Sequence, residues 1–130
     1  MLPIHNSYTA YPPATDRQIL HIENKLNCQL PSAYTLVLKE SNGLSFTNGV
    51  FIYGTEEIVE RNETWEVAEY AKGYIAIGGD DSGGMIFLMA IKAEDFRVFA
   101  VDSGDMTPPE HATLITSDLS KWLQEGCQYE

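Results

Sequence analysis

Apolar residues at helical spacing predict two helices in the first third of the chain. Residues 15–18 read Thr-Asp-Arg-Gln, a capping box in which the threonine oxygen accepts the amide hydrogen of the glutamine. A first helix is expected from there to about Asn27. Leu30-Pro31 begins a second helix, because proline is tolerated in a first helical turn, and Asn42-Gly43 ends it. Residues 1–14, with three prolines, are expected to form an irregular arm.

After Gly43 the pattern changes from helical to alternating. Residues 44–46 and 50–53 are expected to pair as strands, since Asn-Gly at positions 48 and 49 is a hairpin signal. Further strands are expected at residues 74–77, 85–91 and 96–102. The apolar run at residues 85–91 is typical of a central strand covered on both faces. Thr55 is expected to cap a short helix, residues 78–84 to form a glycine-rich turn, and residues 103–110 to form a loop. Residues 116–118 open a last helix, closed by Gly126.

The order of these elements predicts an α+β fold. A length of 130 residues fits one domain. Residues 15–130 are therefore expected to form a single domain, with a mixed or antiparallel sheet flanked by two N-terminal helices and one C-terminal helix. The sequence does not decide between a monomer and a homodimer.

Charge is distributed unevenly along the chain. Asp and Glu number 19 against 8 Lys and Arg, for a net charge of −11. The first 55 residues hold three acids and three bases, so the whole excess lies in residues 56–130. A field of this sign repels nucleic acids and anionic membranes and attracts a basic partner protein. Solubility alone would account for the same total charge.

The densest acidic stretch spans residues 56–69, with six glutamates against one arginine. Its two interpretations are a surface for a cationic partner and a solvated helix face. Together with the aspartates of the glycine-rich turn, this stretch supplies the candidate partner-binding residues. They are Glu56, Glu57, Glu60, Glu63, Asp80 and Asp81.

The glycine-rich turn contains Asp-Ser-Gly-Gly, the string around the nucleophile of chymotrypsin-like serine proteases. A triad needs an imidazole base and an orienting carboxylate, and the chain is too short for that two-barrel fold. Glycines that supply positive φ in a turn are the favoured interpretation. Asp80 and Asp81 are oxygen ligands of the kind that divalent cations prefer, but metal-ligand spacings are absent. No catalytic residue, metal or cofactor is expected; a metal-dependent hydrolase using Asp80, Asp81 and Ser82 is the alternative class.

Cysteine use and hydropathy favour a cytoplasmic protein. Cys28 and Cys127 are far apart and form no metal-ligand spacing, so two reduced thiols are expected. No apolar stretch approaches the roughly 18–20 residues of a membrane span. The first residues lack the charged and apolar regions of a signal peptide.

The order of motifs resembles the SUKH superfamily, which includes fungal cell-wall synthesis regulators and many bacterial proteins. The motifs that carry the resemblance lie between residues 15 and 125. They are Leu30-Pro31-Ser32-Ala33-Tyr34, Ser41-Asn42-Gly43, the Ile75–Gly84 string, Val98–Asp102 and Ile115–Leu123. The resemblance implies an α+β fold with a mixed sheet flanked by helices, and no catalytic residues.

The family's shared motifs correspond here to residues that we interpret as fold residues. They are Pro31, Tyr34, Asn42, Gly43, Gly78, Asp80 and Gly84. Met85 departs from the family's pattern, in which a small polar or acidic residue is more usual after the last glycine.

In bacteria, the resemblance implies, such proteins are mostly immunity proteins that neutralise toxins, often nucleases. Our leading hypothesis is therefore a non-enzymatic immunity protein whose acidic surface occupies the basic cleft of a toxin. The alternative within the family is a regulatory scaffold like the fungal members. A toxin-like neighbouring gene would favour the first, and a biosynthetic operon the second.

Overall fold

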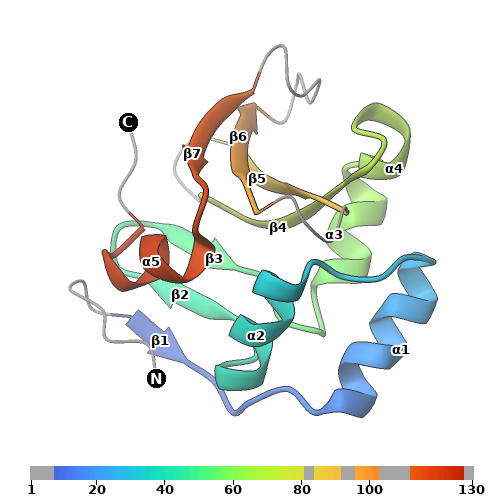
Figure 1. Cartoon of the computed structure of the whole chain (residues 1–130), viewed down its shortest axis with the longest axis horizontal. Helices are drawn as coiled ribbons and strands as arrows, with labels where there is room; N and C mark the ends of the chain where they lie inside the picture. The colour runs from blue at the N-terminus through green and yellow to red at the C-terminus, as the bar shows by residue number, and fades with distance from the viewer. Residues whose placement is uncertain (1–7, 81–83, 92–95, 103–111, 128–130) are drawn as a thin grey trace.

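The computed structural model describes residues 8–80, 84–91, 96–102 and 112–127 (Figure 1). Over these residues the chain folds as the expected α+β domain, with one seven-stranded sheet and five helices. The strands are β1 (Tyr8–Ala10), β2 (Leu44–Phe46), β3 (Val50–Ile52), β4 (Tyr74–Asp80), β5 (Met85–Ala90), β6 (Val98–Asp102) and β7 (Thr113–Thr116). The helices are α1 (Asp16–Leu26), α2 (Ser32–Glu40), α3 (Ile58–Thr64), α4 (Val67–Tyr70) and α5 (Leu119–Gln124).

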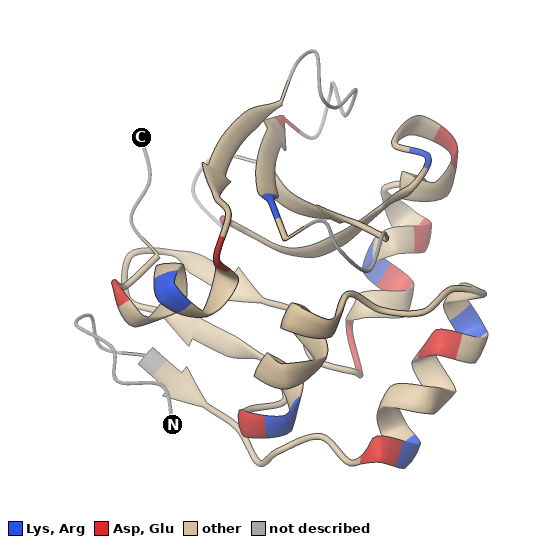
Figure 2. Ribbon diagram, in the orientation of Figure 1, with Lys and Arg blue, Asp and Glu red and all other residues tan. Residues whose placement is uncertain are grey.

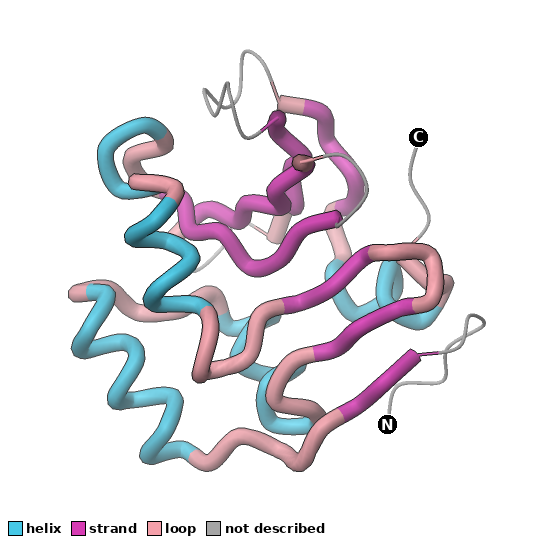
Figure 3. Tube along the Cα trace, turned by 180° about the vertical axis from the view of Figure 1, so that it is seen from behind, coloured by secondary structure: helices cyan, strands magenta, loops and turns pink. Residues whose placement is uncertain are grey.

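The sheet is a meander in which each strand pairs with the next along the chain. All six pairings among the described strands are antiparallel, so the sheet is antiparallel and not mixed. A β-bulge between Ala76 and Gly78 interrupts the register of β4 with β5. Bulges bend and twist a strand, and the sheet changes direction at β4 (Figure 1). Helices α2 and α5 cover one face of β1–β3, and α1, α3 and α4 follow one another along one side (Figures 1 and 3).

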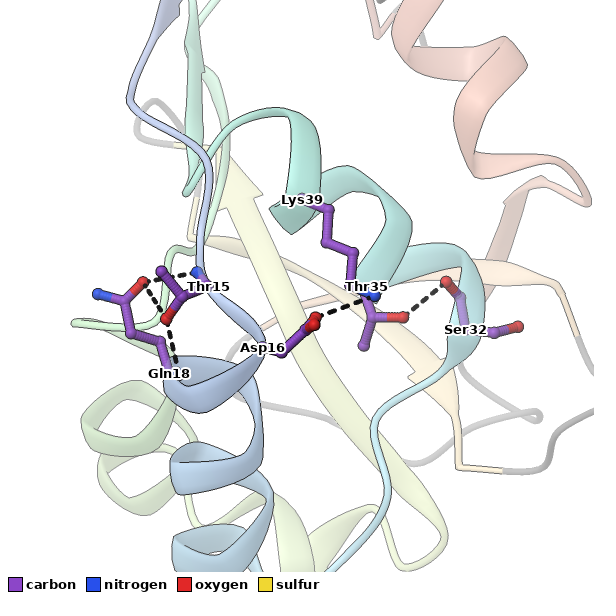
Figure 4. Close-up of polar contacts among 6 residues, drawn as sticks. All are labelled: Thr15, Asp16, Gln18, Ser32, Thr35 and Lys39. Carbon is purple, nitrogen blue, oxygen red and sulfur yellow. Dashed lines mark hydrogen bonds and ion pairs between the residues drawn. The ribbon is translucent and has the colours of Figure 1, made fainter.

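Helix α1 begins as the capping box predicts. The Gln18 amide donates to Thr15 Oγ1 at 3.1 Å, and the Thr15 amide donates to Gln18 Oε1 at 2.8 Å (Figure 4). Ile19 and Ile22 face the core, and Asn27 ends the helix in the left-handed region. An exposed ion pair of 3.1 Å between Lys39 and Asp16 links α2 to this helix start.

The motif residues of α2 hold the helix against the hairpin. The Tyr34 hydroxyl, fully buried, donates to the carbonyl of Tyr53 just after β3. At the other end, Asn42 accepts from the Thr55 amide at 2.7 Å and donates to Thr55 Oγ1 at 2.9 Å. The expectation that Thr55 caps α3 is therefore wrong: Glu57 occupies the N-cap position, and no side chain caps it.

Strand β4 is longer than the sequence indicates. Residues 78–80, expected in a turn, pair with all of β3. Gly78 is required there, because a Cβ atom at this position would lie 2.1 Å from the carbonyl oxygen of Phe51. A Cβ atom at Gly79 would lie 2.8 Å from the Met85 carbonyl oxygen and 3.2 Å from the Phe51 ring. The glycines thus allow close backbone approach and not, at these two positions, a turn.

The core lies around β5. Five of its six residues are buried, as expected for a central strand, and β4 and β6 flank it. Phe87 packs edge-on against Trp122 of α5, with ring centroids 5.2 Å apart. Asp118 caps α5 by accepting from the Lys121 amide at 3.1 Å. The C-terminal helix α5 therefore packs on the central strand β5 and covers part of the core.

The two edge strands of the sheet are not predicted by the sequence pattern. Residues 8–10 of the expected arm form β1, which pairs with β2, while residues 1–7 lie outside the described residues. At the other edge, β7 pairs with β6 in a part of the chain where no strand is expected from the sequence.

The cysteines agree with the sequence-based expectation of reduced thiols, since Cys28 and Cys127 are unpaired. Across the described residues, no helix is both long enough and apolar enough to cross a membrane.

Candidate partner-binding surface

Residues 56–69, here called the acidic segment, run from the end of the β3–α3 connection through α3 to α4. The acidic positions of α3 and α4 lie along one side of the molecule (Figure 2). All six glutamates of the segment are exposed. They are Glu56, Glu57, Glu60, Glu63, Glu66 and Glu69.

A buried asparagine holds the acidic segment on the sheet. Asn62 of α3 is 8% exposed. Its amide nitrogen donates to the carbonyls of Ile58 at 2.8 Å and Ala76 at 3.0 Å, and its oxygen accepts from the Ala76 amide at 2.9 Å. Asn62 thus bonds both backbone polar groups of Ala76, a residue that adjoins the bulge of β4. Ile58 and Val67 add apolar anchors, and the glutamates are left on the solvent side.

One glutamate of the segment is already neutralised. Arg61 donates to both oxygens of Glu60, at 2.9 and 2.7 Å, and Thr64 also donates to this carboxylate. These hydrogen bonds hold the pKa of Glu60 below its ordinary value, with the Arg61 bonds the larger cause. Glu60 is therefore a carboxylate at neutral pH whose charge Arg61 offsets, which leaves the other glutamates to set the local field.

Glu57 has a structural contact as well as a charge. Its Oε1 accepts from the Gly54 amide at 3.3 Å, at the start of the connection into α3. Gly54 has no room for a side chain, since a Cβ would lie 2.5 Å from the Asn42 carbonyl oxygen. The glycine and the asparagine thus place Glu56 and Glu57 immediately before the helix.

The structure does not bring Asp80 together with the glutamates. Asp80 pairs with Val50, the first residue of β3, whereas Glu56 follows the last residue of that strand, Ile52. Asp80 is half-buried and also pairs with Met85. Asp81 and Ser82 lie outside the described residues. Of the six candidate positions, four therefore lie on the acidic segment and Asp80 lies at the opposite end of β3.

The described residues offer no cluster of His, Cys, Asp or Glu that could hold a metal ion. His21 is exposed on α1, and the other two histidines lie outside the described residues. Burial raises the pKa of the Cys127 thiol. Burial also raises the pKa of the Cys28 thiol, with the nearby charge of Glu23 as a second cause. Raised values favour the neutral thiol, which is the poorer nucleophile.

A groove of about 540 Å³ borders the acidic segment. Glu63, Glu66 and Glu69 line one side of it, and Lys25 at the end of α1 and Lys72 after α4 also contribute. Sequence reasoning did not assign Lys25 to this surface, because α1 precedes the segment by some 30 residues and meets it only in the fold. The two lysines offset part of the charge of the three glutamates that line the groove, whereas Glu56 and Glu57 lie outside its lining.

The fold and this surface define a class of α+β protein with an antiparallel meander and an exposed acidic face. The model of the SMI1/KNR4 family (SUKH-1) matches residues 13–125, and the chain belongs to this family. A relative from Bacillus subtilis (strain 168), described as "Uncharacterized protein YnaB", is 36% identical over 66 residues. The match covers 51% of this chain and 44% of that protein, so the chain spans less than half the length of this relative.

Proposed function

We propose that the protein is a non-enzymatic binding domain that acts as an immunity protein, neutralising a basic toxin domain through the acidic segment. The observation that carries the proposal is the exposure of all six glutamates on a segment that Asn62 hydrogen-bonds to the sheet. Family membership adds that SUKH proteins in bacteria are mostly immunity proteins.

The proposed mechanism is electrostatic occlusion. A toxin that cleaves nucleic acid holds its substrate with Lys and Arg side chains in a cleft. A surface of exposed carboxylates is complementary to such a cleft, speeds the encounter and excludes the substrate. Glu56 and Glu63 are the best placed contributors, because neither carboxylate has a protein contact among those described for the segment.

The first step of the test is to look for a toxin-like gene beside this one, because such a neighbour would favour an immunity protein over a regulatory scaffold. The toxin domain encoded by that neighbour is then the binding partner in the assay. Association is measured by stopped-flow or surface plasmon resonance over a series of NaCl concentrations. We expect Glu63→Lys to slow association about tenfold at low salt and the difference to shrink as salt rises. Glu125→Lys, on the loop after α5, makes the same change in net charge and serves as the matched control.

Two outcomes would contradict the proposal. Equal effects of Glu63→Lys and Glu125→Lys would show that total charge matters and the acidic segment does not. An affinity that changes neither with salt nor with charge reversal would rule out the electrostatic mechanism and would indicate an apolar interface instead.

A further inference from the structure

The turn between β2 and β3 is tied to the segment that follows α5. The side-chain amide nitrogen of Asn48 in this turn donates to the carbonyls of Gly126 at 3.1 Å and Cys127 at 3.4 Å. Its oxygen accepts from the Val50 amide at 3.2 Å. The turn and the end of α5 are 78 residues apart in the sequence and lie side by side in the fold (Figures 1 and 3). One side-chain amide therefore joins the hairpin to the segment after α5.

Asn48 is followed by Gly49, the neighbour beside which an asparagine is most prone to deamidation. The Gly49 backbone nitrogen can attack the side-chain carbonyl carbon of Asn48, because glycine has no Cβ to shield this nitrogen. A bond forms between the nitrogen and the carbon, the bond from the carbon to Nδ2 breaks, and Nδ2 leaves as ammonia with the proton of the Gly49 amide. Water then opens the cyclic imide, which gives aspartate or isoaspartate.

The chain contains a second Asn-Gly pair, Asn42-Gly43, which the fold protects. Asn42 holds Thr55 through two hydrogen bonds of 2.7 and 2.9 Å, and Gly43 is buried. Asn48 is exposed, and its three hydrogen bonds are longer, at 3.1 to 3.4 Å. The structure thus leaves one of the two pairs open to water.

Deamidation at Asn48 would reverse the hydrogen-bonding character of the tie. The amide nitrogen is a donor, whereas an ionised carboxylate only accepts hydrogen bonds, and aspartate is ionised at neutral pH. The carbonyls of Gly126 and Cys127 would then face a negatively charged acceptor. In the aspartate product the Val50 amide keeps an acceptor oxygen, so the loss falls on the segment after α5. In the isoaspartate product the main chain of the turn is also longer by one carbon atom.

We propose that Asn48 is a self-modification site, at which deamidation releases the segment after α5 from the turn between β2 and β3. The reaction needs only water, and hydroxide accelerates it because the Gly49 amide must lose its proton. Ageing of the protein therefore adds a negative charge at this turn and frees the carbonyls of Gly126 and Cys127. The site shares no residue with the acidic segment, so it does not depend on the proposed function.

The first test follows the reaction itself. The purified protein is incubated at neutral pH and in mildly alkaline buffer, and digested samples are mapped by mass spectrometry, with electron-transfer fragmentation to distinguish isoaspartate from aspartate. We expect deamidation at Asn48, faster in the alkaline buffer, while Asn42 and Asn24 stay intact. Asn24 is the matched comparison, because it is exposed on α1 and is followed by lysine. Equal rates at Asn48 and Asn24, or a faster reaction at Asn42, would overturn the proposal.

The second test measures the release. The Cys127 amide donates to the Trp122 carbonyl at 3.0 Å, so its hydrogen exchange reports opening of the segment after α5. Asn48→Asp should speed this exchange about tenfold, since the free energy of one hydrogen bond is lost. Asn24→Asp makes the same change in charge on α1 and should leave the exchange unchanged.

The aged protein provides the same measurement without a variant. Its deamidated form, separated from the unmodified form by ion exchange, should exchange the Cys127 amide as fast as Asn48→Asp does. Exchange as slow as in the unmodified protein would show that the tie does not hold the segment, and would overturn the proposal. Equal acceleration in Asn24→Asp would do the same, because the added charge and not the lost hydrogen bond would then be the cause.

Discussion

Glu66 has a backbone conformation that is unusual for a residue with a long side chain. Its φ of 51° and ψ of 45° lie in the left-handed region, between the end of α3 and the start of α4. The conformation lets the Glu66 amide donate to the Glu63 carbonyl at 3.1 Å, while its own carbonyl accepts from the amides of Glu69 and Tyr70. Glycine is the usual residue where a helix ends this way, so the glutamate carries a conformational cost of roughly 1 kcal/mol.

Replacing this residue with glycine should therefore stabilise the fold. We expect Glu66→Gly to raise the free energy of unfolding by up to about 0.5 kcal/mol, because relief of the left-handed strain exceeds the added entropy of the unfolded chain. Glu69→Gly removes the same charge from within α4, at an ordinary helical position, and should lower it by about 1 kcal/mol. Urea denaturation followed by circular dichroism measures both. A loss of stability in Glu66→Gly would mean that the glutamate side chain contributes a contact larger than the strain.

At the scale of elements, signals that are local in sequence predicted structure well. The capping box of α1 involves residues three apart, and the apolar run of β5 reports burial on both faces directly. By contrast, Gly78 and Gly79 resembled a turn, because composition does not show that the backbone of β3 passes close to them. Edge strands β1 and β7 are short and depend on their neighbours, so their own residues carried little signal.

The candidate surface was predictable only where its residues are close together in the sequence. The glutamates of residues 56–69 are contiguous, so their density could be counted. The role of Asn62 could not be predicted, because its partner Ala76 is 14 residues further along the chain and lies next to a bulge in β4. Thr55 is a similar case: it resembles a helix cap, but Asn42, 13 residues earlier, takes both of its polar groups.

The start of α1 offers a test of how much its cap contributes. Thr15→Ala removes the acceptor for the Gln18 amide and should lower the free energy of unfolding by about 1 kcal/mol. Thr35→Ala is the matched control, because Thr35 Oγ1 donates to the Ser32 carbonyl at 3.0 Å within α2, an exposed contact that alanine's helix propensity should offset (Figure 4). Thermal denaturation of both variants checks this. Equal losses would show that removal of a threonine methyl, and not the cap, causes the effect.

For the whole molecule, buried acidic groups predict sensitivity to alkali. Burial, as the largest cause, raises the pKa of Tyr34, Tyr53 and Cys127 in the folded state. The unfolded chain releases these protons near the ordinary values of 9.0 for cysteine and 10.0 for tyrosine. Above about pH 9 the unfolded state thus binds fewer protons than the folded state, so stability is complete below this pH and falls as pH rises.

The free energy of unfolding, measured by urea titration across this range, should decline by up to about 1.4 kcal/mol per pH unit for each such group once its unfolded form ionises. Cys127→Ala lowers stability at neutral pH through a cavity but should show a shallower decline. A midpoint that is unchanged at pH 10.0, the ordinary tyrosine value, would contradict the expected neutral burial of Cys127.

The net charge of −11 has opposite consequences for folding and for binding. Self-repulsion opposes the compact state, and salt screens it over a Debye length of about 10 Å at 0.1 M. NaCl added from about 0.02 M to about 0.2 M should therefore raise the melting temperature of the isolated protein by a few degrees. The same salt should slow association with a basic partner, because screening weakens the attraction that speeds the encounter.

Glu63→Lys separates the two effects within one variant. It relieves repulsion in the acidic segment, so its melting temperature at low salt should exceed that of the unaltered protein and should depend less on NaCl. Association with the basic partner should slow in the same variant. A melting temperature that falls with added NaCl would mean that ion pairs such as Arg61 with Glu60 outweigh repulsion in the folded state. The excess of glutamates would then stabilise the fold, and its distribution along residues 56–130 would need no partner to explain it.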